Sequence, residues 1–170
     1  QDITLSNYII KEGRSFLLVF NKWDLIKNQH EEQKKMINNI KDIFFDAKGI
    51  NILFISSKED RYKRKVCEAI IDVYKKWNKK IGTSELNRWF SSIWEKGSNK
   101  KIPGSLKFKY IAQNKIRPPT FNLYHNKNSK VPKVAKRYIV NRIREKFGFE
   151  GIPIRINLMT SKNPFNKKSN

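Results

Sequence analysis

The hydrophobic residues in the first half of the chain follow two different spacings. Residues 15–20 and 50–55 are almost continuously apolar, which is typical of strands buried on both faces of a parallel sheet. Apolar residues recur at helical spacing within residues 2–12, 36–47 and 66–77. The resulting order of helix, strand, helix, strand and helix predicts an α/β fold.

The third of these helices leads to two finer predictions. Cys67, the only cysteine of the chain, lies beside its apolar residues and is predicted to be a buried structural thiol rather than a nucleophile. The apolar residues share one stripe that we expect to pack on the sheet: Val66, Ala69, Ile70, Val73 and Trp77.

The pattern changes after Trp77, where residues 78–82 form a short polar link. Beyond the link we expect a helix that starts at Thr83 or Ser84, two strands, a second helix opened by Pro132, and a last strand. This order predicts a one-sided antiparallel or mixed sheet that is covered by helices. The strands are expected at residues 106–110, 121–124 and 154–158.

The first of these three strands alternates between apolar and basic residues. Leu106, Phe108 and Tyr110 are therefore expected on one face of the sheet, and Lys107 and Lys109 on the other. The apolar face would pack on the helices, and the two lysines would face the solvent.

Charge separates the two halves of the chain. Its 170 residues include 37 Lys and Arg against 15 Asp and Glu, which gives a net charge of +22. Residues 1–80 carry a net charge of +6, whereas residues 81–170 carry +16. A field of this strength attracts polyanions, either nucleic acid or an anionic membrane surface, and the second half is where they would bind. The alternative is an AT-rich coding bias, because the chain is also rich in Asn and Ile.

Several common classes of protein do not fit this sequence. No apolar run is long enough to span a membrane, and the first residues lack the pattern of a signal peptide. A single cysteine excludes an internal disulfide framework and fits a reducing compartment. We therefore expect a cytoplasmic protein without a membrane partner. Because the chain begins with Gln1 rather than Met, we also expect it to start partway through a longer protein.

A polar motif, Asn21-Lys22-Trp23-Asp24, follows the first predicted strand directly. It matches N-K-x-D, the guanine-recognition motif of GTPases. A carboxylate such as that of Asp24 accepts hydrogen bonds from the ring N–H and the exocyclic amine of guanine, a donor pair that adenine lacks. Asn21 is expected to tether neighbouring loops, and the stem of Lys22 to lie along the base. The alternative is an ordinary polar turn after a strand.

A second motif, Ser56-Ser57-Lys58, follows the second predicted strand. It resembles the other guanine loop of GTPases, usually S-A-K, in which a backbone N–H donates to the guanine carbonyl oxygen. Ser57 would supply that N–H here, since a backbone donor tolerates the exchange of Ala for Ser. Ligands bind at the carboxyl ends of strands in open α/β sheets, so the two motifs together predict a guanine site.

Two other GTPase motifs do not occur in this sequence. It contains no G-x-x-x-x-G-K-[ST] phosphate loop and no D-x-x-G segment that would contact the γ-phosphate and the metal. Binding of phosphate and Mg²⁺, and hydrolysis itself, depend on these motifs. We therefore expect this chain alone to be inactive as a GTPase and to bind GTP or GDP weakly, without a Mg²⁺ site.

Most of the chain resembles the Der (EngA) family of bacterial tandem GTPases, from about Asp2 to Leu158. The resemblance includes both guanine motifs and continues through the second half in family order. The segments that carry it there are YKKWN (74–78), TSELNRW (83–89), KYIAQ (109–113), RPPTF (117–121), RYIVN (137–141) and FGFEGIPIR (147–155).

This resemblance implies a division of the chain and a function. Residues 1–80 would be the C-terminal half of a P-loop GTPase domain with an α/β fold, and residues 81–160 a small α+β domain of the KH-like type. Residues 161–170 are expected to be a disordered tail. Family members bind GTP and GDP and act in assembly of the large ribosomal subunit. The implied partners are ribosomal RNA and the GTPase regions that precede this chain in the family.

Basic residues in the second half are the candidates for contact with RNA. The residues that we select are Lys107, Lys109, Lys115, Arg117, Lys136, Arg137 and Arg144. For each residue taken singly, the alternative is a solvated surface charge. Two histidines, His30 and His125, have no Cys or carboxylate partners at ligand spacing, and we assign neither to a metal or to catalysis.

Gly148-Phe149-Glu150-Gly151 has the form of the GxxG clamp with which KH domains bind RNA. It lies between a predicted helix and a predicted strand, whereas the clamp joins two helices. Glu150 would also repel phosphate. We therefore interpret the segment as a helix C-cap followed by a turn.

Three hypotheses of function follow. In the first, the chain is the base-recognition and RNA-contacting portion of a GTP hydrolase. In the second, it is a stand-alone basic RNA-binding module that does not bind GTP. In the third, it is a non-functional remnant of a split or truncated gene.

Overall fold

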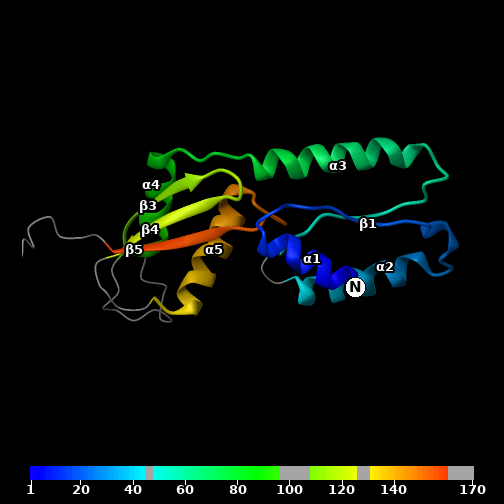
Figure 1. The fold of residues 1–170 in the computed structure, drawn as a ribbon, viewed down its shortest axis with the longest axis horizontal. Helices are drawn as coiled ribbons and strands as arrows, with labels where there is room; N and C mark the ends of the chain where they lie inside the picture. Colours follow the sequence, from blue (N-terminus) through cyan, green and yellow to red (C-terminus); the bar gives the residue numbers. More distant parts are fainter. Residues whose placement is uncertain (45–47, 96–107, 126–130, 161–170) are drawn as a thin grey trace, which may run out of the picture.

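The computed structural model describes residues 1–44, 48–95, 108–125 and 131–160, and its helices and strands follow the predicted order (Figure 1). The fold class is as predicted, an α/β unit followed by a small α+β unit. The elements are α1 (Asp2–Lys11), β1 (Leu18–Phe20), the 3-10 turn η1 (Trp23–Leu25), α2 (Gln29–Ile43), β2 (Ile52–Phe54), α3 (Arg61–Trp77), α4 (Thr83–Glu95), β3 (Phe108–Lys115), β4 (Thr120–His125), α5 (Lys133–Phe147) and β5 (Arg155–Thr160).

The first unit has three layers. Strands β1 and β2 pair in parallel in the middle, with α3 on one side and α1 and α2 on the other (Figure 1). The prediction that β1 is buried on both faces is wrong, because Leu18 and Phe20 are half-buried and Val19 is 41% exposed. In the described part of the chain, no third strand joins this sheet. One edge of β1 therefore has no strand beside it.

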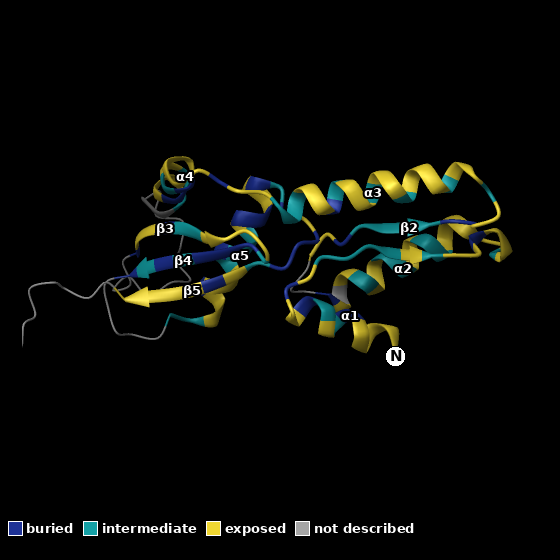
Figure 2. Cartoon of the chain, turned by 45° about the horizontal axis from the view of Figure 1, so that its top comes forward, coloured by how far each residue is buried: buried dark blue, intermediate teal, exposed yellow. Residues whose placement is uncertain are grey.

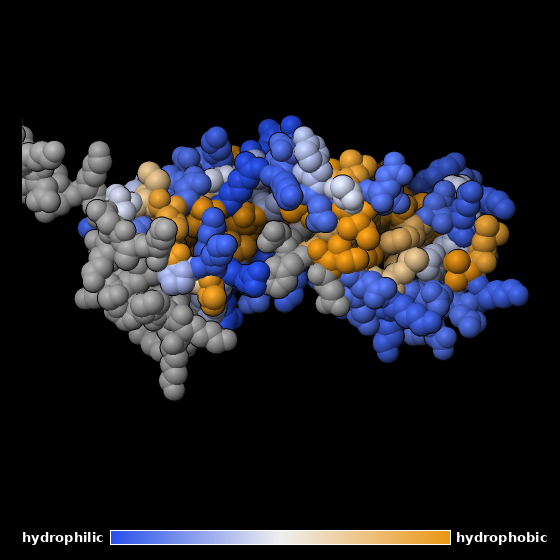
Figure 3. All heavy atoms as spheres, turned by 60° about the horizontal axis from the view of Figure 1, so that its bottom comes forward, coloured by the Kyte–Doolittle hydropathy of each residue, from blue (hydrophilic) through white to orange (hydrophobic). Residues whose placement is uncertain are grey.

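An apolar groove opens beside β1, between α1 and α2. It has a volume of about 420 Å³, and the two helices and the strand all contribute to it. Figure 3 shows hydrophobic side chains on the surface of this unit. Apolar residues from the three elements line the groove: Ile3, Val19, Met36, Ile40 and Ile43.

The predicted stripe on α3 is only partly buried. Val73 is buried and Trp77 is half-buried, but Ile70 is 52% exposed. Cys67 is also exposed, so the prediction of a buried thiol is wrong. A sheet of two short strands covers only a narrow stripe of a 17-residue helix, and much of α3 faces the solvent (Figure 2).

The second unit is built on a mixed sheet in the order β3-β4-β5. Strands β3 and β4 are antiparallel, and β4 and β5 are parallel. Helices α4 and α5 pack on this sheet, and Val73 of α3 joins the same hydrophobic core. The core includes fully buried residues from the sheet and both helices, β5 excepted: Leu86, Ile111, Phe121, Leu123, Ile139 and Ile143.

Strand β3 does not alternate as its sequence predicts. Phe108 is 9% exposed and packs in the core, whereas Tyr110 is 43% exposed. A register shift between these two residues is the reason, because it interrupts the alternation at Lys109, which is exposed. The predicted positions of Leu106 and Lys107 lie outside the described residues.

The two units are joined by contacts to backbone atoms. The Gly151 N–H donates to the Lys48 carbonyl oxygen at 2.8 Å. Within the first unit, the Trp77 indole N–H donates to the Gly13 carbonyl oxygen at 3.2 Å and holds the end of α3 beside the loop that follows α1. An Arg155 guanidinium N–H donates to the Lys11 carbonyl oxygen at 2.7 Å. The bonds of Gly151 and Arg155 therefore hold the first unit against the second.

The G-F-E-G segment lies in this junction. Gly148 adopts a left-handed conformation with φ of 67° directly after α5, which fits the expected helix C-cap. Gly151 has φ of 72°, and a Cβ atom there would lie 2.8 Å from the Gly49 carbonyl oxygen and 2.9 Å from the Ile50 Cα. The segment thus packs closely on residues 49 and 50.

We expect the substitution Gly151→Ala to destabilise the chain by about 2 kcal/mol or more. A residue with a Cβ is strained at the φ of Gly151, and the added Cβ would also clash with backbone atoms. The melting temperature would fall by about 4–8 °C for a chain of this size. The control is Gly82→Ala, because a Cβ at Gly82 meets nothing within 4 Å. Equal melting temperatures of the two variants in calorimetry would contradict the prediction.

Candidate functional site

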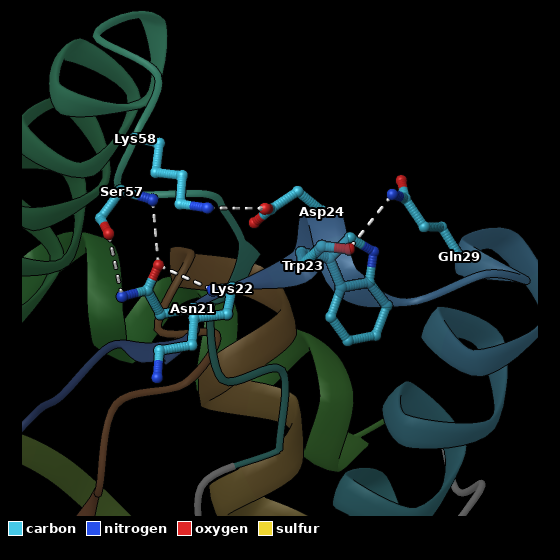
Figure 4. A network of polar contacts seen from close by, with 7 residues as sticks. All are labelled: Asn21, Lys22, Trp23, Asp24, Gln29, Ser57 and Lys58. Carbon is cyan, nitrogen blue, oxygen red and sulfur yellow. Dashed lines mark hydrogen bonds and ion pairs between the residues drawn. The ribbon is translucent and has the colours of Figure 1, made fainter.

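The two polar motifs of the first unit lie at the same edge of its sheet. Because β1 and β2 are parallel, their carboxyl ends point the same way, and residues 21–24 and 56–58 follow these ends directly. Asn21 connects the two loops (Figure 4). Its Oδ1 accepts the Ser57 N–H at 3.0 Å and the Lys22 N–H at 2.7 Å, and its Nδ2 donates to the Ser57 Oγ at 3.3 Å.

Trp23 anchors the first loop in the unit. It is 7% exposed, and its ring lies 4.4 Å from that of Phe54 and 6.5 Å from that of Phe20, between centroids. Its N–H donates to the Ile55 carbonyl oxygen at 2.9 Å, and its carbonyl accepts the Gln29 side-chain amide at 3.1 Å. With Trp23 fixed, the side chains on either side of it are held outside the core.

Asp24 is exposed, and its surroundings favour the ionised carboxylate. A hydrogen bond from Ser56 is the main cause that lowers the pKa of Asp24, and Lys58 adds an attraction from 3.9 Å. Ser56 itself is 3% exposed. An ionised carboxylate accepts hydrogen bonds without donating any, which is what a base with two adjacent donors requires.

Lys22 is exposed, as a residue that lies along a bound base would have to be, whereas the Ser57 N–H that would bind the base already has a partner. Lys22 has a left-handed backbone with φ of 58°, and its side chain is exposed at the mouth of the loops. The Ser57 N–H, which we expect to donate to a guanine carbonyl, donates to Asn21 in this structure. Binding of a base through this N–H would therefore require the bond to Asn21 to be shared or exchanged.

The predicted RNA-contacting residues fall into three groups. Five of them are exposed in the described part of the chain: Lys109, Lys115, Arg117, Lys136 and Arg137. Lys107 lies outside the described residues. Arg144 is 3% exposed, unlike the other five, but it is among the residues that line the basic cleft described below. It lies on the packed side of α5, where it donates to the Asn141 Oδ1 at 2.9 Å.

A basic cleft lies between α5, the start of β5 and the end of α1. It has a volume of about 350 Å³, and none of the described residues that line it is Asp or Glu. Lys136 and Arg137 line it as part of α5, where a third cation, Lys133, stands in the first turn. Cations at a helix N-terminus oppose the helix dipole, so an anion bound here would relieve repulsion.

Sequence reasoning missed three cations of this cleft: Lys11, Lys133 and Arg155. Lys133 could have been found from its position one turn before Lys136 on a predicted helix. Lys11 and Arg155 are 144 positions apart and meet only because Arg155 donates to the Lys11 carbonyl oxygen. No local pattern in the sequence signals that contact.

The described residues offer no cluster that could hold a metal ion. No group of three or more His, Cys, Asp and Glu side chains lies together among them. His125 is buried with its ring 6.3 Å from that of Phe108, and His30 is exposed. None of the helices in the described part of the chain is both long and apolar enough to cross a membrane.

Comparison with known proteins finds relatives along nearly the whole chain. Residues 80–158 match the family described as the KH-domain-like C-terminal domain of EngA bacterial GTPase enzymes. The chain is 39% identical over 169 residues to GTPase Der from Rickettsia canadensis (strain McKiel) and from Rickettsia bellii (strain OSU 85-389). It is 38% identical over 169 residues to GTPase Der from Rickettsia prowazekii (strain Madrid E).

These alignments cover 97% of this chain but only 37–38% of the length of each relative. The chain thus spans less than half the length of the curated relatives that it matches. The fold and the two loops described above lie within the shared part.

Ser56 provides a test of the electrostatics of the loops. We expect Ser56→Ala to raise the pKa of Asp24 toward that of an ordinary aspartate, because the hydrogen bond from Ser56 is the main cause of its lowering. Carboxyl-carbon NMR titration would measure the change. Ser57→Ala is the matched control, since the Ser57 hydroxyl bonds to Asn21 instead. An unchanged pKa in Ser56→Ala, or an equal rise in both variants, would contradict this assignment.

Proposed function

Because this chain belongs to the Der (EngA) family of tandem GTPases and corresponds to its C-terminal part, we propose that it is a portion of a GTP-binding ribosome-assembly protein. In this proposal, residues 1–80 contribute guanine recognition and residues 81–160 contribute contact with ribosomal RNA of the large subunit. The proposed location is the cytoplasm.

One observation carries the nucleotide part of the proposal. The parallel pairing of β1 and β2 places Asp24, Asn21 and Ser57 together at one edge of the sheet, although the two loops are 36 positions apart. Asp24 supplies the acceptors for the guanine ring N–H and amine, and its lowered pKa keeps it ionised. Ser57 would supply the N–H for the carbonyl of the base. The loops therefore select a base and do not perform a reaction.

Phosphate binding and hydrolysis are assigned to other regions of the family protein. They require a phosphate loop and a D-x-x-G segment, neither of which occurs in this sequence. GTP and GDP are thus the proposed ligands of the larger protein, together with Mg²⁺. This chain alone would retain a weak preference for the guanine base.

The RNA part of the proposal is supported by charge and shape. The cleft between α5, β5 and α1 gathers cations, and none of its described lining residues is Asp or Glu. Except for Ile10 and Lys11 of α1, the residues that line the cleft come from the half of the sequence with a net charge of +16. Phosphates bind such surfaces without reading sequence, so the expected affinity depends strongly on salt.

The second candidate is a basic RNA-binding module that does not use GTP. The exchange needed at Ser57 favours it, because the N–H meant for guanine already has a partner in Asn21. A guanine-selective response of the loops separates the two candidates.

We expect millimolar GDP, but not ADP, to shift the NMR signals of the Lys22 and Ser57 amides. Asp24→Asn should weaken this response about 10- to 100-fold, because it removes charge-assisted hydrogen bonds. Asp60→Asn is the control, since its carboxylate is exposed and pairs with Lys63 outside the loops. Equal responses to GDP and ADP would refute guanine recognition. A dissociation constant near 1 μM would show that phosphate binding does not depend on the missing motifs.

RNA binding should depend on the cations of the cleft. We expect Lys133→Glu combined with Lys136→Glu to weaken binding of an RNA oligonucleotide at least tenfold. The slope of affinity against salt should fall by about 1 for each phosphate that the variant no longer binds. Lys34→Glu with Lys41→Glu makes the same change of charge on exposed positions of α2 and is the control. Equal weakening in both variants, or affinity that does not vary with salt, would refute the assignment.

A further inference from the structure

The sheet of the second unit has one face that neither α4 nor α5 covers in the described part of the chain. Phe108, Ile111, Phe121, Leu123 and Ile156 point into the core with α4 and α5. The register places the alternate residues of the three strands on the opposite face. Two rows of side chains stand there, Tyr110 with Tyr124 and Met159, and Ala112 with Asn122 and Asn157.

The two tyrosines form a flat aromatic pair. Their ring centroids are 4.1 Å apart, and their planes are inclined by only 13°. Tyr110 is 43% exposed. Partial burial, followed by the hydrogen bond with the Tyr124 hydroxyl, raises the pKa of Tyr110, so Tyr110 stays neutral at physiological pH. A cross-strand pair of this kind stabilises a sheet modestly, which is one reason for two tyrosines to stand opposite each other. It does not explain why the side chains around them are amides and cations.

The side chains around the tyrosines are amides and cations. The Asn157 side-chain amide donates to the Asn122 Oδ1 at 3.1 Å, and amides of this kind present both donors and acceptors. Lys109 adjoins Tyr110, and Arg155 begins β5 four residues before Met159, about 13 Å along the strand. None of the three strands contains an Asp or Glu.

We propose that this open face of the sheet binds an unpaired segment of RNA, with bases stacked on Tyr110 and Tyr124 and phosphates held by the flanking cations. The inference rests on the proposed function, in which residues 81–160 contact RNA. It adds the class of RNA and the side chains that read it.

Single-stranded RNA fits this face better than other polyanions. Aromatic side chains on an open sheet stack two or three unpaired bases in other RNA-binding domains, and stacking tolerates any base sequence. A duplex keeps its bases stacked inside and offers only its backbone, so it would not use the tyrosines. A membrane surface would also engage only the cations.

The test compares three probes that share a phosphate backbone. These are a ten-nucleotide oligouridine, an abasic ribose-phosphate oligomer of the same length, and a ten-base-pair RNA duplex. We expect the oligouridine to bind tightest. Tyr110→Leu combined with Tyr124→Leu should weaken its binding at least tenfold, because each stacked base contributes on that scale, and should leave the abasic oligomer unchanged. Tyr110→Phe with Tyr124→Phe should retain binding.

A matched control uses two exposed tyrosines of the first unit. Tyr8→Leu with Tyr74→Leu replaces rings that are 63% and 55% exposed, and it should not change the affinity for any probe. Photocross-linking of the unsubstituted chain to 5-bromouridine RNA gives a second readout that no folding defect of a variant can disturb. Cross-links should map to Tyr110 or Tyr124.

The possible outcomes separate this inference from the function on which it rests. Equal affinity for oligouridine and the abasic oligomer, with cross-links only elsewhere, would overturn the stacking surface while RNA binding stands. Failure of the chain to bind any of the three probes would overturn the proposed RNA contact itself. Loss of binding in the Phe variant as large as in the Leu variant would also overturn stacking, since Phe retains the ring.

Discussion

The two units of this chain meet where two glycines leave no room for a Cβ atom. A Cβ at Gly151 would lie within 2.9 Å of backbone atoms of residues 49 and 50, and a Cβ at Gly13 would lie 2.6 Å from the Pro118 ring. Hydrogen bonds from Gly151 to Lys48 and from Arg155 to Lys11 cross the same junction. The basic cleft depends on this contact, because it brings Lys11 of α1 to the cations of α5 and β5.

The order of elements could be predicted from the sequence because hydrophobic periodicity is a local property. Burial of β1 could not, since it depends on how many strands stand beside it, and the described sheet has two. The exposure of Ile70 and Cys67 has the same cause, because a narrow sheet covers little of α3. The register shift at Lys109 could not be predicted for another reason. It arises in the pairing of β3 with β4, and it puts the Tyr110 side chain on the opposite face of the sheet from Phe108.

In the candidate site, too, local features could be predicted from the sequence, and contacts between distant segments could not. The guanine motifs could be located because each directly follows an apolar run, and their proximity required only parallel pairing. Asn21 was expected to tether neighbouring loops, but that it does so through the Ser57 N–H, the donor meant for guanine, could not be foreseen from either motif alone. Basic residues were harder to sort, since Lys136 and Arg144 both line the cleft from α5, but Lys136 is exposed and Arg144 is buried.

The length of helix α3 also determines how strongly the charges of the two proposed ligands interact. It begins three residues after Lys58 and ends at Trp77, over whose ring the Arg117 guanidinium of the second unit lies. Its 17 residues span about 25 Å, roughly three Debye lengths at physiological ionic strength. Through the solvent, the field of the second unit would therefore be almost fully screened at Asp24. A nucleotide and an RNA strand could occupy the two ends of the molecule with little mutual repulsion, although both are polyanions.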